Sequence, residues 1–270
     1  MPELPEVETS VRALRQPLVG RTFTEVRCYW PRQIVTPSLP ELQQRLHGQQ
    51  VTAISRRAKY LLFHLSSGDY LIVHLKMTGH LSVVDGDTPA DKHTHLIFRL
   101  ANGQELRFRD MRKFGRVYLV SDRDEVLAGL GPEPLEDEFT VDRLHERLNG
   151  RSRALKPLLL DQTFVAGIGN IYADEALFAA RLHPERKANS LSNSDVDALH
   201  QAIQQVLRLG IEREGASIQN YVKPDGKRGD MQNAVAVFRR TGYPCPNCQT
   251  PIERIVLGGR STHFCPVCQQ

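Results

Sequence analysis

The chain begins with a helical pattern of apolar positions. Val7, Val11, Leu14 and Leu18 recur at intervals of three or four residues, and Pro5 suits the first turn of a helix. This spacing predicts an amphipathic helix of about a dozen residues directly after the extreme N-terminus. Such a helix directs the positive end of its dipole back toward the first residues of the chain.

From about residue 51 to residue 120 the apolar positions alternate as they do in strands. The segments on either side of Asn102-Gly103 alternate in this way, and that pair favours a tight hairpin turn. Two further apolar runs flank a turn rich in Ser, Gly and Asp. Since strands joined by short turns pair antiparallel, we expect residues 1–130 to form a mostly antiparallel β-sandwich with one leading helix.

The second half of the chain changes to a helical period. Residues 121–139 are rich in acidic residues, Gly and Pro, which indicates a connection to another domain. The predicted helices are residues 141–148, 154–160, 171–180 and 194–214, and a polar loop is expected at 214–230. The expected fold class is therefore α+β, with the N-terminal sandwich followed by a helical domain.

Four of the five cysteines form two CxxC pairs near the C-terminus. Cys245 and Cys248 make the first pair, and Cys265 and Cys268 follow after sixteen residues. This spacing matches a zinc site in which four thiolates close a tetrahedron. Two disulfides are the alternative, which an otherwise cysteine-poor cytosolic chain disfavours. Cys28 is expected to be a buried structural thiol.

Composition and charge narrow the class of protein. Hydrophobic residues make up 40% of the chain and charged residues 24%, which excludes a disordered, collagenous or coiled-coil protein. The N-terminus is acidic and no apolar run is long enough to span a membrane, so we expect a cytosolic protein. The net charge of +4 is weak evidence for a polyanionic partner.

The distribution of cations is more informative than the net charge. Residues 107–116 carry five cations and one anion, with Phe108 and Phe114 between them, and a second basic stretch begins at Lys223. Cations that neutralise phosphates, with aromatic rings that stack on bases, are typical of nucleic-acid binding. From the charge alone, a solvated strand face is the simpler explanation.

Four residues could carry chemistry. Removal of Met1 would expose the secondary amine of Pro2, and α-amino groups have lower pKa values than lysine, so more of the neutral nucleophile is present. Glu3 lies beside it as a group for proton transfer. Lys59 interrupts an apolar strand pattern, and Asn170 begins a helix whose N–H groups could bind phosphate. Taken singly, these residues are also explained by a helix start, a solvent-facing lysine and an ordinary cap.

Several segments occur together in an order typical of one enzyme family. After the opening MPELPEVET come RRAKYLL at 56–62, HLKMTG at 74–79, GNIYADEAL at 169–177 and the cysteine ribbon. In this combination, which covers essentially the whole chain, the sequence resembles the formamidopyrimidine-DNA glycosylase (MutM) family. The resemblance favours functional roles for Pro2, Lys59 and Asn170 over the ordinary explanations.

The resemblance implies a bifunctional DNA glycosylase/AP lyase of base excision repair. Such an enzyme flips an oxidised purine, 8-oxoguanine or a formamidopyrimidine, out of duplex DNA. By motif, Pro2 forms the Schiff base, Glu3 assists proton transfer, and Lys59 and Arg260 serve the β- and δ-elimination steps. A single Zn²⁺ held by the four cysteines is expected to be structural, because no coordination position stays open.

Further roles follow from the same resemblance. The implied phosphate contacts are His93, Arg112, Arg151, Lys156 and Asn170. The implied void-filling residues are Met77, Arg112 and Phe114, and residues 214–230, with Ser217 and Tyr221, correspond to a lid over the extruded base. We expect a catalytic sandwich at 1–130, a helix-two-turn-helix domain with the lid at 131–232 and a zinc finger at 233–270. The partner is double-stranded DNA with damaged bases or abasic sites, bound by a monomer in the cytoplasm and nucleoid.

Some positions depart from the family pattern. Met111 and Lys113 stand where Pro and Arg are usual, which alters the rigidity of the void-filling loop, and His263 replaces an aromatic residue. Two alternatives stay open. One is an endonuclease VIII-like enzyme for oxidised pyrimidines, and the other is a zinc-ribbon DNA-binding protein without catalysis.

Overall fold

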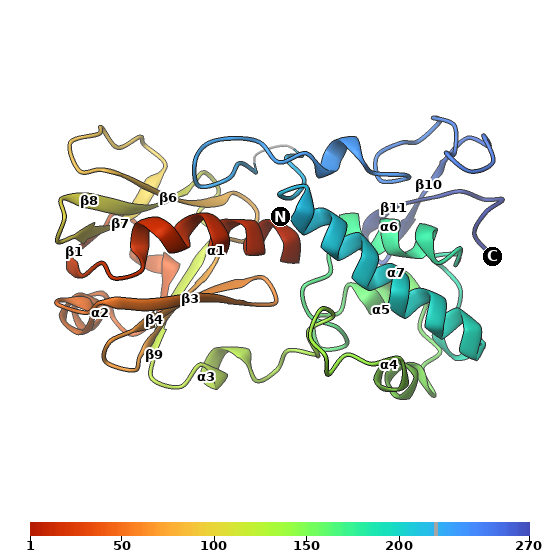
Figure 1. Cartoon of the computed structure of the whole chain (residues 1–270), viewed down its shortest axis with the longest axis horizontal. Helices are drawn as coiled ribbons and strands as arrows, with labels where there is room; N and C mark the ends of the chain where they lie inside the picture. Colours follow the sequence, from red (N-terminus) through yellow and green to blue (C-terminus); the bar gives the residue numbers. More distant parts are fainter. Residues whose placement is uncertain (219–220) are drawn as a thin grey trace. The chain divides into compact units, whose positions relative to one another are not determined.

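The protein, described here by a computed structural model of residues 1–218 and 221–270, divides into two compact units (Figure 1). Unit 1 consists of Met1–Ala128 and Glu214–Asp230, and unit 2 of Gly129–Arg213 and Met231–Gln270. None of the described helices combines the length and apolar character needed to span a bilayer.

Unit 1 is built on two sheets. One has the order β1-β7-β8-β6, and the other has the order β2-β9-β5-β4-β3. The strands are β1 Phe23–Cys28, β2 Ile34–Thr36, β3 Val51–Arg57, β4 Tyr60–Leu65, β5 Tyr70–His74, β6 Gly79–Asp85, β7 Thr94–Leu100, β8 Gln104–Asp110 and β9 Arg116–Val120. All neighbouring strands pair antiparallel except β2 and β9, which are parallel.

The leading helix α1, Leu4–Leu18, contacts both sheets and lies between them in Figure 1. Its four predicted apolar positions are fully buried in one core cluster with residues of both sheets. The predicted hairpin at Asn102-Gly103 joins β7 to β8, with Gly103 at φ +86°. The predicted sandwich with its leading helix is confirmed. The further short helices are η1 Pro31–Gln33, α2 Leu39–Leu46 and α3 Asp124–Leu127, which the apolar pattern did not indicate.

Unit 2 is helical with a C-terminal hairpin. Its elements are α4 Val141–Leu148, α5 Leu155–Leu159, α6 Asn170–Ala179, η2 Ala188–Ser190, α7 Asn193–Glu212, η3 Met231–Asn233, β10 Glu253–Leu257 and β11 Arg260–Phe264. The four predicted helices all form, and their ends differ from the prediction by at most two residues. Thr140 caps α4, and Ser192 caps α7 in a capping box with Asp195.

Helix α6 is the centre of unit 2, and its residues from Ile171 to Phe178 are all buried. Helix α7 packs closely on it at Gly210, where an added Cβ would lie 2.5 Å from the Tyr172 ring. Only glycine allows this approach. Phe178 of α6 also joins a small apolar cluster with Val237, Ile252 and two cysteines, so that the cysteine-rich segment rests on this helix.

The segment Glu214–Asp230 belongs by its contacts to unit 1, whereas the predicted domain 131–232 grouped it with the helices. The physical reason is hydrogen bonding. The Ala216 N–H donates to Glu6 Oε1 at 2.7 Å, and the His80 ring meets the Lys223 carbonyl at 3.0 Å. Residues 219–220 of the predicted lid lie outside the described part of the chain.

Candidate active site and nucleic-acid interface

The N-terminal residues are buried parts of unit 1. Pro2 is buried, and Glu3, at 3% exposure, is the N-cap of α1. Glu3 and Glu6 form a capping box in which the Glu3 N–H donates to Glu6 Oε2 at 2.8 Å. This arrangement fixes the backbone beside Pro2 in one conformation and brings two carboxyl groups next to the second residue of the chain.

Glu6 also joins the N-terminal helix to the predicted lid. Its other carboxylate oxygen accepts the Ala216 N–H, and its carbonyl accepts the Tyr221 hydroxyl at 3.1 Å. Gly215, at φ +82°, leaves room for the Glu6 side chain, since a Cβ there would lie 2.9 Å from Glu6 Cγ. Burial raises the pKa of Tyr221, so this hydroxyl is a donor at neutral pH. No separate role for Glu6 was predicted, although an acid at position N3 of a helix is a recognisable sign of a capping box.

The predicted lid residue Ser217 lies in the same segment. Its side chain is buried, and its hydroxyl oxygen accepts the Gly229 N–H at 2.8 Å. The Ser217 carbonyl accepts a hydrogen bond from Arg228 at 2.9 Å. These contacts close the segment on itself from residue 217 to residue 229.

Lys59 lies in the tight turn between β3 and β4 rather than within a strand. The turn is formed by Ala58, at φ +51°, and Lys59, while Arg57 pairs with Tyr60. A turn lysine is normally solvated, yet Lys59 is 4% exposed. Its burial in unit 1 agrees with a role inside a site and differs from the solvent-facing alternative.

His74, at the end of β5, is a neutral imidazole near Lys59. Burial, with the charges of Lys76 and Lys59, lowers the pKa of His74 to about 3. Its Nδ1 accepts the Lys76 N–H at 2.9 Å, and Tyr60 packs edge-on against the ring at 4.6 Å. The motif HLKMTG contained this residue, but its spacing alone did not distinguish it as part of a site.

The three predicted void-filling residues lie together on unit 1. The Arg112 guanidinium lies 4.6 Å from the Phe114 ring centroid, and its Nη1 lies 2.9 Å from Met77 Sδ. Met77 and Phe114 are 42% and 44% exposed. Two apolar side chains and a guanidinium therefore project from two neighbouring loops as one exposed cluster, which is the composition expected of a wedge that enters a base stack.

Asp110 holds the loop that carries two of these residues. It is fully buried, and its carboxylate accepts the Gly115 N–H at 2.7 Å, the Arg112 N–H at 3.2 Å and the Thr78 hydroxyl. These bonds tie the loop between β8 and β9 to the loop that carries Met77. The sequence showed Asp110 only as the one anion in a basic stretch. The predicted phosphate contact His93 is half-buried, and its carbonyl accepts the Asp110 N–H at 2.8 Å.

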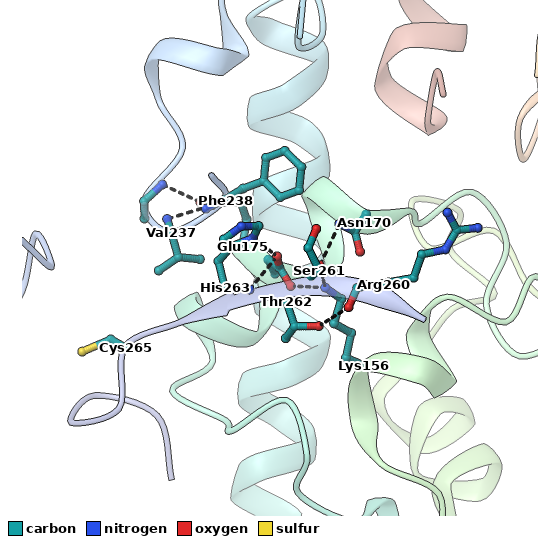
Figure 2. A network of polar contacts seen from close by, with 12 residues as sticks. Lys156, Asn170, Glu175, Val237, Phe238, Arg260, Ser261, Thr262, His263 and Cys265 are labelled. Atoms are coloured by element: carbon teal, nitrogen blue, oxygen red, sulfur yellow. Dashed lines mark hydrogen bonds and ion pairs between the residues drawn. The ribbon is translucent and has the colours of Figure 1, made fainter. Parts of the chain in front are cut away.

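In unit 2 a polar network joins β11 to α6 (Figure 2). The Lys156 ammonium lies 2.6 Å from Asp174 Oδ1 and donates to the Ser261 carbonyl at 2.7 Å. Asp174 Oδ2 accepts the His263 N–H and lies 3.0 Å from His263 Nδ1. Lys156 and Asp174 are fully buried. The Lys156 ammonium is thus held in a buried ion pair, and its contact with phosphate stays a prediction.

Asn170 begins α6 and meets the same carbonyl, since its Nδ2 donates to Ser261 O at 3.0 Å. Arg260 is the first residue of β11 and directly precedes Ser261. Its side chain is exposed and points away from the network in Figure 2. The structure thus brings Asn170 and Arg260 to one end of β11. Arg151 is exposed beyond α4, where its Nε donates to the Arg147 carbonyl at 2.7 Å.

Glu175 anchors the segment that leads into the cysteine ribbon. Its carboxylate accepts the N–H groups of Ala236, Val237 and Phe238 at 2.7 to 3.0 Å (Figure 2). Burial raises the pKa of the Glu175 carboxyl, and the three N–H donors oppose this shift. Asp174 and Glu175 interrupt an otherwise apolar helix. Two acids at apolar positions could have indicated from the sequence that both are buried with polar partners.

The four cysteines converge as a candidate metal centre. Cys245, Cys248, Cys265 and Cys268 have Sγ atoms that all lie within 4.8 Å of one another. Two of the separations are 3.8 Å and 3.4 Å, near the edge of about 3.8 Å that Zn–S bonds of ~2.3 Å give a tetrahedron. The donor set and its geometry fit one structural zinc ion.

Comparison with known proteins identifies the family. Residues 1–117 match the formamidopyrimidine-DNA glycosylase N-terminal domain, residues 130–222 the H2TH domain of the same enzymes, and residues 242–270 the zinc finger found in FPG and IleRS. The predicted helix-two-turn-helix domain and zinc finger are thereby confirmed.

Full-length relatives agree with the domain matches. The formamidopyrimidine-DNA glycosylase of Herpetosiphon aurantiacus is 51% identical over 100% of both chains, and that of Desulforamulus reducens is 46% identical over 100% of this chain and 99% of its own. A variant of the Lactococcus lactis enzyme, solved with DNA that contains Fapy-dG, superposes with a TM-score of 0.94 at 40% identity over 100% of both chains. The chain belongs to the formamidopyrimidine-DNA glycosylase family.

Proposed function

We propose that this protein is a bifunctional DNA glycosylase/AP lyase that excises 8-oxoguanine and formamidopyrimidines and then cleaves the DNA backbone. The observation that carries the proposal is the burial of Pro2 and Glu3 at the capped start of α1, where a terminal tail would ordinarily be exposed. Solved relatives bound to DNA with Fapy-dG or an abasic site support the substrate class. The proposal places the enzyme, as a monomer, on the nucleoid in the cytoplasm.

The first step is nucleophilic. After removal of Met1, the Pro2 nitrogen forms a bond to C1′ of the damaged nucleotide while the bond from C1′ to the base breaks, and the base leaves with the electron pair and takes up a proton. A secondary amine with the pKa of an α-amino group is more often neutral than a lysine. Glu3 assists by moving a proton as the sugar ring opens and the iminium forms.

The iminium makes the C2′ proton acidic, so the two phosphates can leave in turn. In the first elimination the C2′ proton is lost and the bond to the 3′ phosphate breaks, and Lys59 donates the proton to that leaving group. In the second elimination the C4′ proton is lost and the bond from C5′ to the oxygen of the 5′ phosphate breaks, and Arg260 assists the departure of that phosphate. The burial of Lys59 supports its part, because the ammonium is held inside unit 1 and not in bulk solvent.

The DNA is held and opened by other residues. Met77, Arg112 and Phe114 enter the space left by the flipped nucleotide, with Arg112 directed at the orphaned base. His93, Arg151 and Asn170 contact phosphates. The segment with Ser217 and Tyr221 covers the extruded base. The zinc, when bound, folds the ribbon that carries Arg260 and takes no part in the chemistry.

Borohydride trapping on duplexes with an abasic site tests the mechanism. A Schiff base is reduced to a stable adduct, and mass mapping of the adducted peptide is expected to find the sugar on Pro2. Adduct on a lysine, or retention of Met1, contradicts the role of Pro2. The absence of any adduct supports a DNA-binding protein without catalysis.

A comparison of lesions tests the substrate. The rates of excision of 8-oxoguanine opposite cytosine and of thymine glycol are measured on otherwise identical duplexes. The proposal expects preference for the oxidised purine, and preference for thymine glycol assigns the chain to the pyrimidine-directed alternative. Glu3→Gln is the matched variant, which is expected to bind the lesion duplex and lose excision.

A further inference from the structure

Trp30 lies against the loop that carries Arg112 and Phe114. It is half-buried directly before η1, and the Lys113 ammonium lies 4.3 Å from its ring centroid. A cation at this distance over an indole face is attracted by the ring quadrupole. The Arg32 guanidinium also lies near the ring, at 5.5 Å, so Trp30 contacts two cations from two different segments of unit 1.

Lys113 stands between Arg112 and Phe114 and has an unusual backbone. Its φ is +58°, in the left-handed region that residues other than glycine rarely adopt. Such a conformation persists where contacts around it hold it in place. The Trp30 ring supplies a contact to the side chain at this position, and the Lys113 N–H donates to the Asp110 carbonyl at 3.3 Å.

A second contact joins the same two segments. Gln33, the last residue of η1, is fully buried, and its Nε2 lies 3.4 Å from Asp110 Oδ2. Its backbone N–H donates to the Trp30 carbonyl at 3.0 Å. The segment Trp30–Gln33 therefore touches the loop at its buried anchor, Asp110, and at its strained middle, Lys113.

We propose that Trp30 is a positioning residue for Arg112 and thereby helps to set the preference for the base opposite the lesion. This inference rests on the proposed function, because it assumes that Arg112 meets the orphaned base. Lysine is a point charge on a flexible stem, whereas arginine is a planar fork that stacks on rings. The contact with the Trp30 indole therefore restricts the conformations of the flexible Lys113 side chain and of the loop that carries Arg112 and Phe114.

Opposite-base discrimination tests the proposal. The ratio of kcat/KM for 8-oxoguanine opposite cytosine to that opposite thymine is measured for Trp30→Leu and Lys113→Met. Each is expected to lower the ratio about threefold to fivefold, the size expected for one half-exposed cation–π pair. The double variant is expected to be no worse than either single variant, because both remove the same contact. Trp30→Phe and Lys113→Arg, which keep a ring and a cation, retain more of the ratio.

The control is Tyr29→Leu, which removes the neighbouring exposed aromatic residue and is expected to leave the ratio unchanged. A purely structural role for Trp30 lowers kcat/KM on both duplexes equally. An unchanged ratio in Trp30→Leu and Lys113→Met, or additive effects in the double variant, overturns the proposal.

Fluorescence separates this proposal from the proposed function. Trp30 is the single tryptophan of the chain, so all indole emission reports on it. In the free protein, Lys113→Met is expected to change the emission of Trp30 and its quenching by acrylamide, because the contact between Lys113 and the ring is lost. Tyr29→Leu keeps this contact and is expected to change neither in the same way. If the wild-type protein excises no 8-oxoguanine, the proposed function fails, and an emission unaffected by Lys113→Met rejects the Trp30 contact independently.

Discussion

Two buried aspartates, Asp110 in unit 1 and Asp174 in unit 2, organise their surroundings in different ways. Asp110 accepts hydrogen bonds from neutral groups, namely two backbone N–H groups, a hydroxyl and an amide. Asp174 meets a fully buried ammonium and a histidine. The first arrangement leaves the side chains of its loop exposed for a ligand, and the second takes its cation out of solvent altogether.

The two arrangements differ in which groups satisfy the carboxylate, and therefore in which cations stay exposed to solvent. Around Asp110 the cations Arg112 and Lys113 are exposed, since backbone and hydroxyl donors satisfy the carboxylate. In unit 2 the carboxylate is satisfied by Lys156 itself. The donors of a buried aspartate thus determine what happens to the nearby cations. Neutral donors leave the cations exposed, whereas a charged donor is itself buried in an ion pair.

The zinc site gives the largest expected effect, since β11 runs from the Asp174 network directly into Cys265. Structural zinc contributes about 10 to 16 kcal/mol in isolated finger peptides. Cys265→Ser is expected to abolish zinc binding, measured by metal analysis, and to expose residues 242–270 to protease. Cys28→Ser, outside the tetrad, keeps one zinc per chain. Normal zinc content in Cys265→Ser would contradict the four-cysteine site.

Loss of the buried cation is the next largest effect. Lys156→Met leaves Asp174 buried without its ion-pair partner, and breaking such a pair costs about 3 to 5 kcal/mol. The free energy of unfolding in urea measures this cost. Arg153→Met is the matched control, because Arg153 and Asp161 form an exposed pair, of the kind worth less than about 1 kcal/mol. Equal losses of unfolding free energy in the two variants would show that the buried Lys156 pair adds no more to stability than the exposed Arg153 pair.

The neutral network of unit 1 is expected to be less sensitive. Asp110→Asn turns one acceptor into a donor that faces the Gly115 or Arg112 N–H, which costs about 2 kcal/mol. Thr78→Val removes a single hydroxyl donor and is expected to cost about 1 kcal/mol. Thermal and urea unfolding give both values, and an Asp110→Asn variant no less stable than Thr78→Val rejects the anchoring role of Asp110.

Most of the fold could be predicted from local patterns. The helix α1, the hairpin at Asn102-Gly103 and the two CxxC pairs depend on residues close together in the sequence, and all three are present. The helix α2 was not predicted, because its eight residues bury only Leu42 and Leu46, too few positions to establish a period.

The site was predictable only in part, because burial depends on distant residues. Lysine is a residue type that commonly binds phosphate, which made Lys156 a candidate. Its partners Asp174 and Ser261 lie 18 and 105 positions further along the chain. Periodicity does not report such pairs. The cluster of Met77, Arg112 and Phe114 was expected through resemblance, whereas its anchors Asp110 and Gln33 were visible only once the strands were placed.

The smallest predicted effect concerns the neutral histidine of unit 1. The pKa of His74 is lowered from 6.5 to about 3, so the folded protein excludes a proton that the unfolded chain binds below pH 6.5. Acidification therefore favours the unfolded chain, and stability present above pH 6.5 is lost as the pH falls toward 3. Between pH 6.5 and 5.5 this one group removes about 1 kcal/mol.

His74→Asn isolates this contribution, because asparagine can still accept the Lys76 N–H and does not titrate. Urea unfolding of both proteins across this pH range is expected to show a smaller loss of stability in the variant, with a difference of about 1 kcal/mol. Parallel pH profiles would mean that His74 has the same pKa in the folded and unfolded protein. A steeper fall in wild type would show that unit 1 places a neutral imidazole near Lys59, as it places neutral donors around Asp110.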